Sequence, residues 1–175
     1  MSEGAAPNIP NRRPAWLIRE AAGDDDMAVV RTLFEEYAAW LQVDLCFQGF
    51  ADELAGLPGK YAPPAGRLLL ASRGGAVAGG VGLRPLDGDA CEMKRLWVRP
   101  EFRGHGLGRA LAVAVIAAGQ EIGYRSMKLD SMEKLAEALD LYRSLGFAET
   151  GAYHDDESPV RLIFMELDLT GDIAS

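Results

Sequence analysis

A glycine-rich turn that leads into a helix constrains this chain more than any other feature. Gly104, Gly106 and Gly108 alternate with other residues, and an apolar segment of helical pattern follows them to about residue 122. Glycine lets the backbone come close to a ligand, and the first amides of a helix have no partner inside it. The residues before the turn, 91–98, read as a strand. A strand, a glycine turn and a helix in this order predict a backbone cradle for phosphate groups.

The spacing Arg103-x-x-Gly106-x-Gly108 resembles the acyl-CoA pyrophosphate motif of the GNAT superfamily of N-acyltransferases. Downstream, 127–130 resembles the next strand of that family, and 138–147 resembles its characteristic helix and exit turn. The resemblance covers residues 90–169. A Rossmann dinucleotide loop is the competing interpretation, but that loop needs Gly-x-Gly-x-x-Gly after an early strand and an acidic residue about twenty positions later. Here the glycines alternate, and an arginine precedes them.

The resemblance implies an α+β fold in which helices flank a central mixed, mostly antiparallel sheet, the GNAT acyl-CoA N-acyltransferase fold. We expect a disordered tail over 1–14 and a single N-acetyltransferase domain over 15–170, because one core suffices for 175 residues. Hydrophobic periodicity predicts strands at 16–20, 67–72, 76–83, 91–98, 126–130 and 160–169. It predicts helices after 24–26 and at 50–57, 106–122 and 135–145, with Gly146 as the C-cap of the last.

Three smaller patterns each leave a structural and a functional interpretation. The acidic triplet 24–26 is predicted to cap a helix rather than to bind a metal, because consecutive carboxylates point in different directions. The glycines at 79, 80 and 82 indicate close packing or a bulge, with room for an acceptor as the alternative. Cys46 and Cys91 are expected to be buried thiols, since they lack metal-ligand spacing and form no disulfide framework.

Charge and composition exclude several classes of function. A formal net charge of −8 argues against nonspecific binding to nucleic acid or to anionic membranes. A local basic patch can still receive phosphates, and the candidates are Arg95, Arg99, Arg103 and Arg109. We expect a cytoplasmic protein, because no apolar run has transmembrane length and no secretory signal pattern is present at residues 1–4. A homodimer stays open as an assembly.

By resemblance, acetyl-CoA is the co-substrate, and two segments hold it. In the family, the strand before the cradle and the strand after its helix separate and expose backbone groups that pair with the pantetheine arm. The backbone of Leu96, Trp97 and Val98 would offer those groups. The pyrophosphate would lie on Arg103, Gly104, His105, Gly106, Leu107, Gly108 and Arg109.

The expected chemistry is attack of a neutral primary amine on the thioester carbonyl of acetyl-CoA. An amine is mostly protonated at neutral pH, so a group must accept its proton, directly or through water. The resemblance places Glu92 as candidate base, with an ion pair to Lys94, Arg95 or Arg125 as the structural alternative. It places Tyr142 where many members carry the tyrosine that protonates or orients the CoA sulfur, with core packing as the alternative.

Neither histidine is predicted to be a catalytic residue. The backbone amide of His105 is expected to matter more than its ring, and His154 with its acidic neighbours either binds a cationic acceptor or forms a solvated loop. No metal site is expected, because the sequence offers no Cys/His cluster. The alternative function is a non-catalytic acyl-CoA-binding module that regulates or recruits a partner. The acceptor itself does not follow from the fold.

Overall fold

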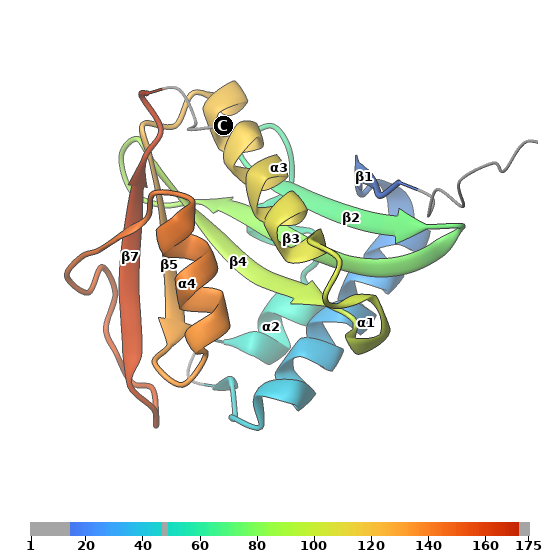
Figure 1. Cartoon of the computed structure of the whole chain (residues 1–175), viewed down its shortest axis with the longest axis horizontal. Coiled ribbons are helices and arrows are strands. Elements are labelled where there is room, and N and C mark those ends of the chain that lie inside the picture. The colour runs from blue at the N-terminus through green and yellow to red at the C-terminus, as the bar shows by residue number, and fades with distance from the viewer. Residues whose placement is uncertain (1–14, 47–48, 172–175) are drawn as a thin grey trace, which may run out of the picture.

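The computed structural model describes residues 15–46 and 49–171, so the predicted tail over 1–14 lies outside the described residues. Within this part of the chain, seven strands form one sheet in the order β1-β2-β3-β4-β5-β7-β6 (Figure 1). The strands are β1 (Leu17–Glu20), β2 (Arg67–Arg73), β3 (Ala76–Pro85), β4 (Ala90–Val98), β5 (Ser126–Met132), β6 (Ala148–Glu149) and β7 (Leu162–Asp168). Only the β4–β5 pair is parallel among these strands. The predicted mixed, mostly antiparallel sheet is confirmed.

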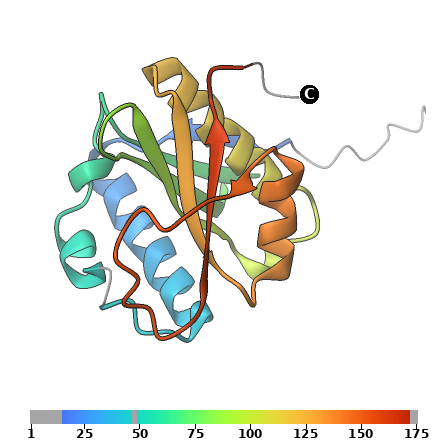
Figure 2. The same cartoon turned by 90° about the vertical axis from the view of Figure 1, so that its left-hand side faces the viewer.

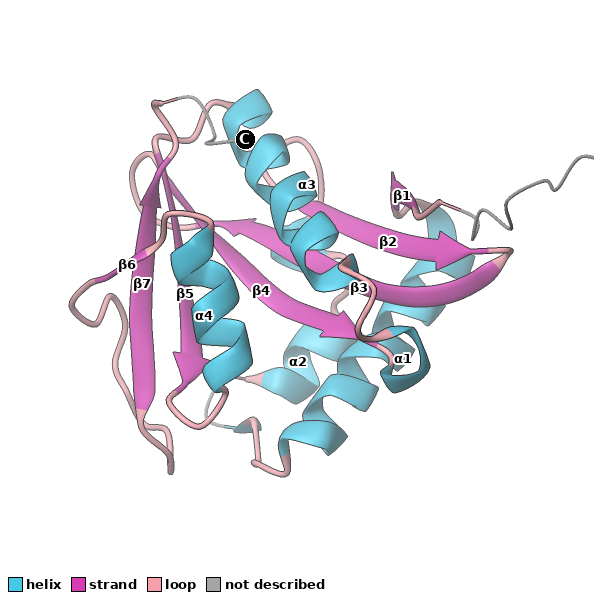
Figure 3. Ribbon diagram, viewed as in Figure 1, coloured by secondary structure: helices cyan, strands magenta, loops and turns pink. Residues whose placement is uncertain are grey.

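Helices cover both faces of this sheet. The two N-terminal helices, α1 (Gly23–Leu41) and α2 (Phe50–Ala55), lie on one face, while α3 (Leu107–Ile122) and α4 (Ala136–Ser144) lie on the other (Figures 2 and 3). Short 3-10 turns at Gly59–Tyr61 and Pro100–Phe102 connect neighbouring elements. No helix in the described ranges is long and apolar enough to cross a membrane.

Each face of the sheet has its own hydrophobic core. On one side, Leu111 and Ile116 of α3 belong to a buried cluster with Met127 of β5. On the other side, Leu33 of α1 clusters with Leu70 of β2. Burial of such side chains is worth about 1.5–3 kcal/mol each, so the two cores fix the sheet between its helices.

The start of α1 differs from the prediction. The helix begins at Gly23 with Ala22 as N-cap, so the acidic triplet 24–26 lies in the first turn and supplies no N-cap residue. Gly23 has a φ of 79°, which lets the chain turn into the helix before the triplet. The Asp26 carboxylate accepts a 2.8 Å hydrogen bond from the Ala22 amide and pairs with Arg19 at 2.6 Å. Negative charge in this first turn still favours the helix.

The glycines of β3 allow close packing, as predicted. A Cβ on Gly82 would lie 2.6 Å from Cε1 of Tyr61, which is too close for any side chain. The pairing with β4 is also irregular here: Gly80 pairs with Trp97 and Gly82 with Lys94, so one residue of β3 faces two of β4. This is a β-bulge, and within it Arg95 adopts a φ of 59°.

Two further details depart from the sequence prediction, and a third agrees with it in part. Cys46 is exposed, not buried, because it lies in the connection after α1, where its amide bonds to Asp44, and not on a core-facing element. The two-residue strand β6 was not predicted, because so short a segment has no periodicity. The C-cap of α4 is Leu145, one residue before the predicted Gly146, and Gly146 follows it with the predicted left-handed conformation, at a φ of 99°.

Candidate active site

A cavity of about 500 Å³ lies where β4 and β5 separate. These parallel strands pair only at Ala90–Glu92 with Ser126–Lys128, and beyond that point they diverge. Elements from both faces of the sheet line the cavity, with Tyr37 from α1, Gly108 from α3 and Tyr142 from α4 among the lining residues. The separation of the strands therefore creates a site that is reached by groups from both layers.

The end of β4 forms one wall of this cavity. Leu96, Trp97 and Val98 line it, and Trp97 and Val98 pair on their other edge with Gly80 and Gly79 of β3. Along the edge that faces β5 they have no partner among the described strands, so backbone groups there are available to a ligand, apart from the Val98 carbonyl, which accepts from Arg103. The Trp97 side chain belongs to the core, where its Nε1 donates a 3.1 Å hydrogen bond to Glu36 of α1.

The glycine turn has the backbone geometry of an anion cradle. Gly104 and Gly106 have φ values of 76° and 78°, a conformation that glycine adopts without strain. Gly106 is the N-cap of α3, and no side chain caps this helix end. The first amides of the helix, including those of Leu107 and Arg109, therefore lack a helical partner. The Leu107 side chain is in the core, so only its backbone can serve a ligand.

Gly108 provides an independent test of whether a ligand fits here. A Cβ at this position would lie 3.8 Å from Leu141 Cδ2 and 4.0 Å from Val98 Cγ2, which are ordinary contacts. Packing within the chain therefore does not require glycine at 108. An approaching pyrophosphate would require it, because a side chain at the helix start would fill the cradle.

The basic and polar side chains of the turn are oriented differently from one another. Arg103 lines the cavity, where its Nε donates to the Val98 carbonyl at 3.0 Å and its guanidinium lies 4.7 Å from the Trp97 ring centre. Arg109 bonds to the Ser144 hydroxyl at the end of α4. His105 is exposed, and its carbonyl accepts a 3.4 Å hydrogen bond from Nε1 of Trp16.

Tyr142 brings a hydroxyl to the cavity from the face of α3 and α4. The residue is 8% exposed, and its ring packs edge-on against Phe147, with 5.9 Å between ring centres. Burial raises the pKa of Tyr142, so the hydroxyl keeps its proton at neutral pH. A protonated phenol in a cavity wall can donate a hydrogen bond to a developing anion.

Glu92 is the last residue of β4 that pairs with β5, and it is 1% exposed. Its carboxylate accepts a 2.7 Å hydrogen bond from Arg84 and a 2.9 Å bond from the Tyr153 hydroxyl. The Lys94 ammonium lies 3.6 Å away. Of the ion-pair partners considered from the sequence, Lys94 is therefore present, and Arg84 was missed. Glu92 is not among the residues that line the cavity.

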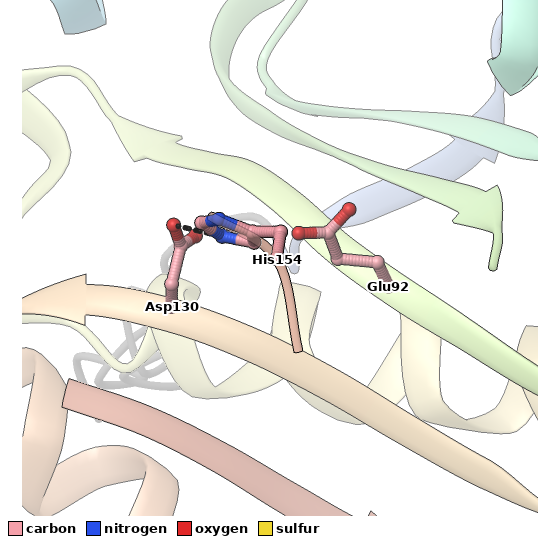
Figure 4. A group of neighbouring side chains, drawn as sticks. All are labelled: Glu92, Asp130 and His154. Atoms are coloured by element: carbon pink, nitrogen blue, oxygen red, sulfur yellow. Dashed lines mark hydrogen bonds and ion pairs between the residues drawn. The ribbon is translucent and has the colours of Figure 1, made fainter. Parts of the chain in front are cut away.

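Next to Glu92, His154 and Asp130 complete a compact polar group (Figure 4). The Nε2 atom of His154 lies 3.2 Å from the Asp130 carboxylate, and its Nδ1 lies 2.9 Å from the Asp155 carbonyl. Because both ring nitrogens face oxygen acceptors, the protonated imidazolium is favoured, and the bond to Asp130 raises the pKa of His154.

One ligand atom from each of Glu92, Asp130 and His154 lies within 4.8 Å of the others, a spacing compatible with a metal ion. The Lys94 ammonium already bonds Asp130 at 3.2 Å, and so a cation neutralises these carboxylates. Burial on its own raises the pKa of Asp130, but the charge of Lys94 and the bonds from His154 and Lys94 outweigh it and lower that pKa. The absence of a metal stays a prediction.

Arg95 is a cavity residue whose position was not predicted, since the sequence suggested it only for a basic patch and as a partner of Glu92, and it pairs with Glu53 instead. The bulge in β4 turns its side chain toward α1 and α2, where Nε donates a 2.9 Å bond to Glu53 and the guanidinium lies 5.1 Å from the Phe50 ring centre. The side chain is 3% exposed and lines the cavity. No local sequence signal marks such a bulge, because it depends on the pairing of two strands.

Comparisons with known proteins agree with this geometry. The model of the acetyltransferase (GNAT) family matches residues 30–147. An uncharacterized N-acetyltransferase of Schizosaccharomyces pombe is 40% identical over 147 residues, which cover 83% of this chain and 90% of that relative. A GNAT-family acetyltransferase from Staphylococcus aureus Mu50 superposes with a TM-score of 0.72 at 21% identity, covering 89% of this chain and 99% of the other. A structure of yncA from Salmonella typhimurium with its cofactor acetyl-CoA gives a TM-score of 0.63 at 24% identity, covering 92% and 98%.

Proposed function

Because this chain belongs to the acetyltransferase (GNAT) family, we propose that it moves the acetyl group of acetyl-CoA to a primary amine by direct attack of the amine on the thioester. Use of acetyl-CoA is supported by a relative named as an N-acetyltransferase and by a structural neighbour that holds acetyl-CoA, while the acceptor and the mechanism belong to this proposal. The observation that carries it is the cavity at the separation of β4 and β5, which joins an unpaired strand edge, a glycine turn and Tyr142.

The cradle residues would hold acetyl-CoA in two ways. The amides at the start of α3, from Gly106 to Arg109, would bind the pyrophosphate, and the free edge of Leu96–Val98 would pair with the pantetheine arm. Acetyl-CoA supplies the thioester, an acyl group already activated for attack by an amine. Arg103 lines the cavity with its Nε bonded to the Val98 carbonyl and its guanidinium over Trp97, and its terminal nitrogens would contact a phosphate.

Tyr142 would assist departure of the CoA thiolate. Its hydroxyl is protonated at neutral pH and lies in the cavity wall, so it can donate a hydrogen bond or a proton to sulfur as the carbon–sulfur bond breaks. General acid assistance of this kind contributes about 10²–10⁴-fold to a rate.

The amine must lose a proton, and Glu92 remains our prediction for the group that finally accepts it. Because Glu92 does not line the cavity, a proton would reach it through water or through Lys94, which does line the cavity and lies 3.6 Å from it. Asp130 also lines the cavity, but its lowered pKa makes it a weaker base.

Incubation of the protein with acetyl-CoA and pooled primary amines tests the proposal through release of free CoA. Amine-dependent release supports an acetyltransferase. Tight binding of acetyl-CoA without release would favour the non-catalytic acyl-CoA-binding module. Greater thermal stabilisation by ATP or NAD than by CoA would contradict both interpretations and indicate another nucleotide-binding protein.

A further inference from the structure

We propose that Arg95 binds a carboxylate of the acceptor, so that the acceptor is an amine that also carries a carboxylate, such as an amino acid. This inference rests on the proposed acetyl transfer and names the class of acceptor for it. The observation behind it is an unsatisfied donor in the wall of the cavity.

Arg95 has hydrogen-bonding capacity that the chain does not use. Its Nε donates to Glu53, but its Nη2 is buried and meets no acceptor within the described ranges. Buried polar groups are nearly always hydrogen-bonded, so a buried guanidinium nitrogen without a partner calls for an explanation. A ligand acceptor atom in the cavity would provide the missing partner, because Arg95 lines that cavity.

The location of Arg95 suits an acceptor rather than CoA. Its bulge directs it to the side of the sheet that α1 and α2 cover, against Glu53 and the ring of Phe50. The glycine turn and Tyr142 belong to the opposite layer, with α3 and α4. An acceptor that contacts Arg95 would therefore approach the thioester through the split from the side away from the cradle.

The backbone conformation of Arg95 also supports a binding role. A φ of 59° is uncommon for a residue with a long side chain, and such conformations cluster at functional sites. Glu53 and the Phe50 ring hold the guanidinium in place, so little freedom is lost when a ligand binds.

Local charge favours an anionic group over a cationic one. Three largely buried carboxylates, those of Glu53, Glu92 and Asp130, are paired with three basic side chains, Arg84, Lys94 and Arg95. His154 bonds to the same Asp130, and in its imidazolium form it leaves this group with one positive charge in excess. A fourth carboxylate would neutralise that charge, despite the net charge of −8 of the whole chain.

A carboxylate is the anion that the geometry fits best. Arginine presents its donors in a planar fork that matches the two oxygens of a carboxylate, and such charge-assisted bonds are strong. Because Glu53 already accepts from Nε, the unpartnered Nη2 is the donor that a ligand carboxylate would meet first.

The test compares L-amino acids with their carboxamides as acceptors, because each pair has the same side chain and differs in one charged group. The kcat/KM ratio of acid to amide is measured for the wild type and for Arg95→Met and Arg95→Lys. Arg73→Met is the matched control: Arg73 also has an unsatisfied Nε, but it stacks on Trp16 and does not line the cavity.

We expect the wild type to prefer the acids, and Arg95→Met to lower the acid-to-amide ratio about 10- to 100-fold, the usual effect of losing a charged hydrogen bond. Arg95→Lys should restore part of the preference, and Arg73→Met should leave the ratio unchanged. Because the ratio is taken within one protein, a general loss of folded enzyme cancels.

Distinct outcomes separate this inference from the proposed function. Acetylation of amines with no preference for acids, or an unchanged ratio in Arg95→Met, would overturn the role of Arg95 and leave acetyl transfer intact. Preference for an aminoalkyl phosphate over every carboxylate would overturn the carboxylate assignment. Where no amine is acetylated, the proposed function fails, and calorimetry of the acid and amide pairs with CoA present still tests Arg95.

Discussion

At the residue scale, the site depends on side chains whose roles follow from what surrounds them. Tyr142 and Tyr153 are both largely buried tyrosines, but the hydroxyl of Tyr153 is committed to Glu92 at 2.9 Å, while Tyr142 lies in the cavity wall. Burial raises the pKa of both. Of these two tyrosines, only Tyr142 is therefore placed to act on a bound thioester.

The first prediction concerns the hydroxyl of Tyr142. Tyr142→Phe should fold and bind acetyl-CoA normally, while kcat falls about 10²–10⁴-fold, because only the general acid is lost. Steady-state kinetics with a screened amine and calorimetry with acetyl-CoA measure the two effects. Tyr124→Phe is the control, since it removes one hydroxyl that bonds the Ala65 carbonyl outside the cavity. Wild-type turnover in Tyr142→Phe would mean that Tyr142 only packs in the core and that its hydroxyl has no catalytic role.

The second prediction concerns Glu92. Glu92→Gln should lower the free energy of unfolding by about 3 kcal/mol, because removal of one partner from a buried ion pair leaves Arg84 and Lys94 poorly compensated. Urea unfolding measures this loss. Glu166→Gln is the control: its pair with Lys128 is long, at 4.0 Å, and partly exposed, so it should cost less than about 1 kcal/mol.

The pH–rate profile of Glu92→Gln separates catalysis from stability. If Glu92 receives the amine proton, the rate should fall most at low pH, where more of the amine is protonated. An unchanged rate and profile in the folded variant would assign the proton to water or to another residue, and Glu92 would then be a structural charge.

Some residues of the site could be predicted from the sequence and others could not. The glycine turn and Tyr142 lie in local motifs, so the resemblance of those motifs to the GNAT family was enough to select them. Arg95 depends on a bulge between two strands, and the partners of Glu92 come from β3 and from the loop before β7. Such contacts are set by tertiary pairing, which one sequence does not encode in a local pattern.

At the element scale, the N-terminus of α3 and the loop between β6 and β7 are the two elements that shape the site. The helix start has no side-chain cap, and its glycines leave the first turn open. The loop delivers Tyr153 and His154 to two buried carboxylates on neighbouring strands. The start of α3 leaves backbone amides for a ligand, and the loop between β6 and β7 holds β4 and β5 together where they begin to separate.

The third prediction tests the helix start. Gly108→Asp should fold, because a Cβ there makes only ordinary contacts, yet it should abolish acetyl-CoA binding by placing a carboxylate where the pyrophosphate lies. Gly106→Asp should also abolish binding but adds backbone strain, because φ is 78°. Gly151→Asp adds the same charge in an open loop as a control. Equal affinity by calorimetry in a folded Gly108→Asp protein would contradict the cradle.

Arg103→Ala tests the side chain that leads the motif. If its guanidinium turns to a phosphate oxygen, the variant should bind acetyl-CoA more weakly by about 1–3 kcal/mol. An unchanged affinity would mean that Arg103 only packs on Trp97 and Trp40, the rings it covers without ligand.

The fourth prediction follows from the loop. The pKa of His154 is raised in the fold, so its contact with Asp130 stabilises the protein fully below about pH 6.5 and loses its effect as pH rises through the folded pKa. The coupling between His154→Asn and Asp130→Asn in a double-mutant cycle of urea unfolding should therefore shrink as pH increases. A coupling that is constant across this range would mean that the contact does not involve the imidazolium.

The elements themselves were largely predictable, and their ends were less so. Periodicity located α1, α3 and the β2–β3 hairpin because each buries one face. The start of α1 was wrong because a positive φ at Gly23 replaced a side-chain cap, and β6 was missed because it has only two residues. Local conformations of this kind compete with propensity and are settled by packing.

At the scale of the whole molecule, the sheet is one continuous layer that opens in its middle. The parallel β4–β5 pair holds three residues on each strand, whereas β5 and β7 pair along seven. The core on the α3 side contains residues of β2, β3, β4, β5 and β7, so it joins the strands on both sides of the split. Because the cores on both faces of the sheet stabilise the fold, the facing edges of β4 and β5 can stay unpaired beyond Glu92 and Lys128. A ligand that pairs with those edges should stabilise the folded state.

The last prediction tests this property of the molecule. Acetyl-CoA at 100 times its Kd should raise the free energy of unfolding by about 2.7 kcal/mol, because it binds only the folded chain. Hydrogen exchange should locate the gain: bound ligand should protect amides at the end of β4, which lack a strand partner on the β5 side, and leave the fully paired β2–β3 hairpin unchanged. Because ATP and NAD have no pantetheine arm, they should not protect β4. Stabilisation by acetyl-CoA with uniform protection across the sheet would mean that the ligand binds the glycine turn without entering the split.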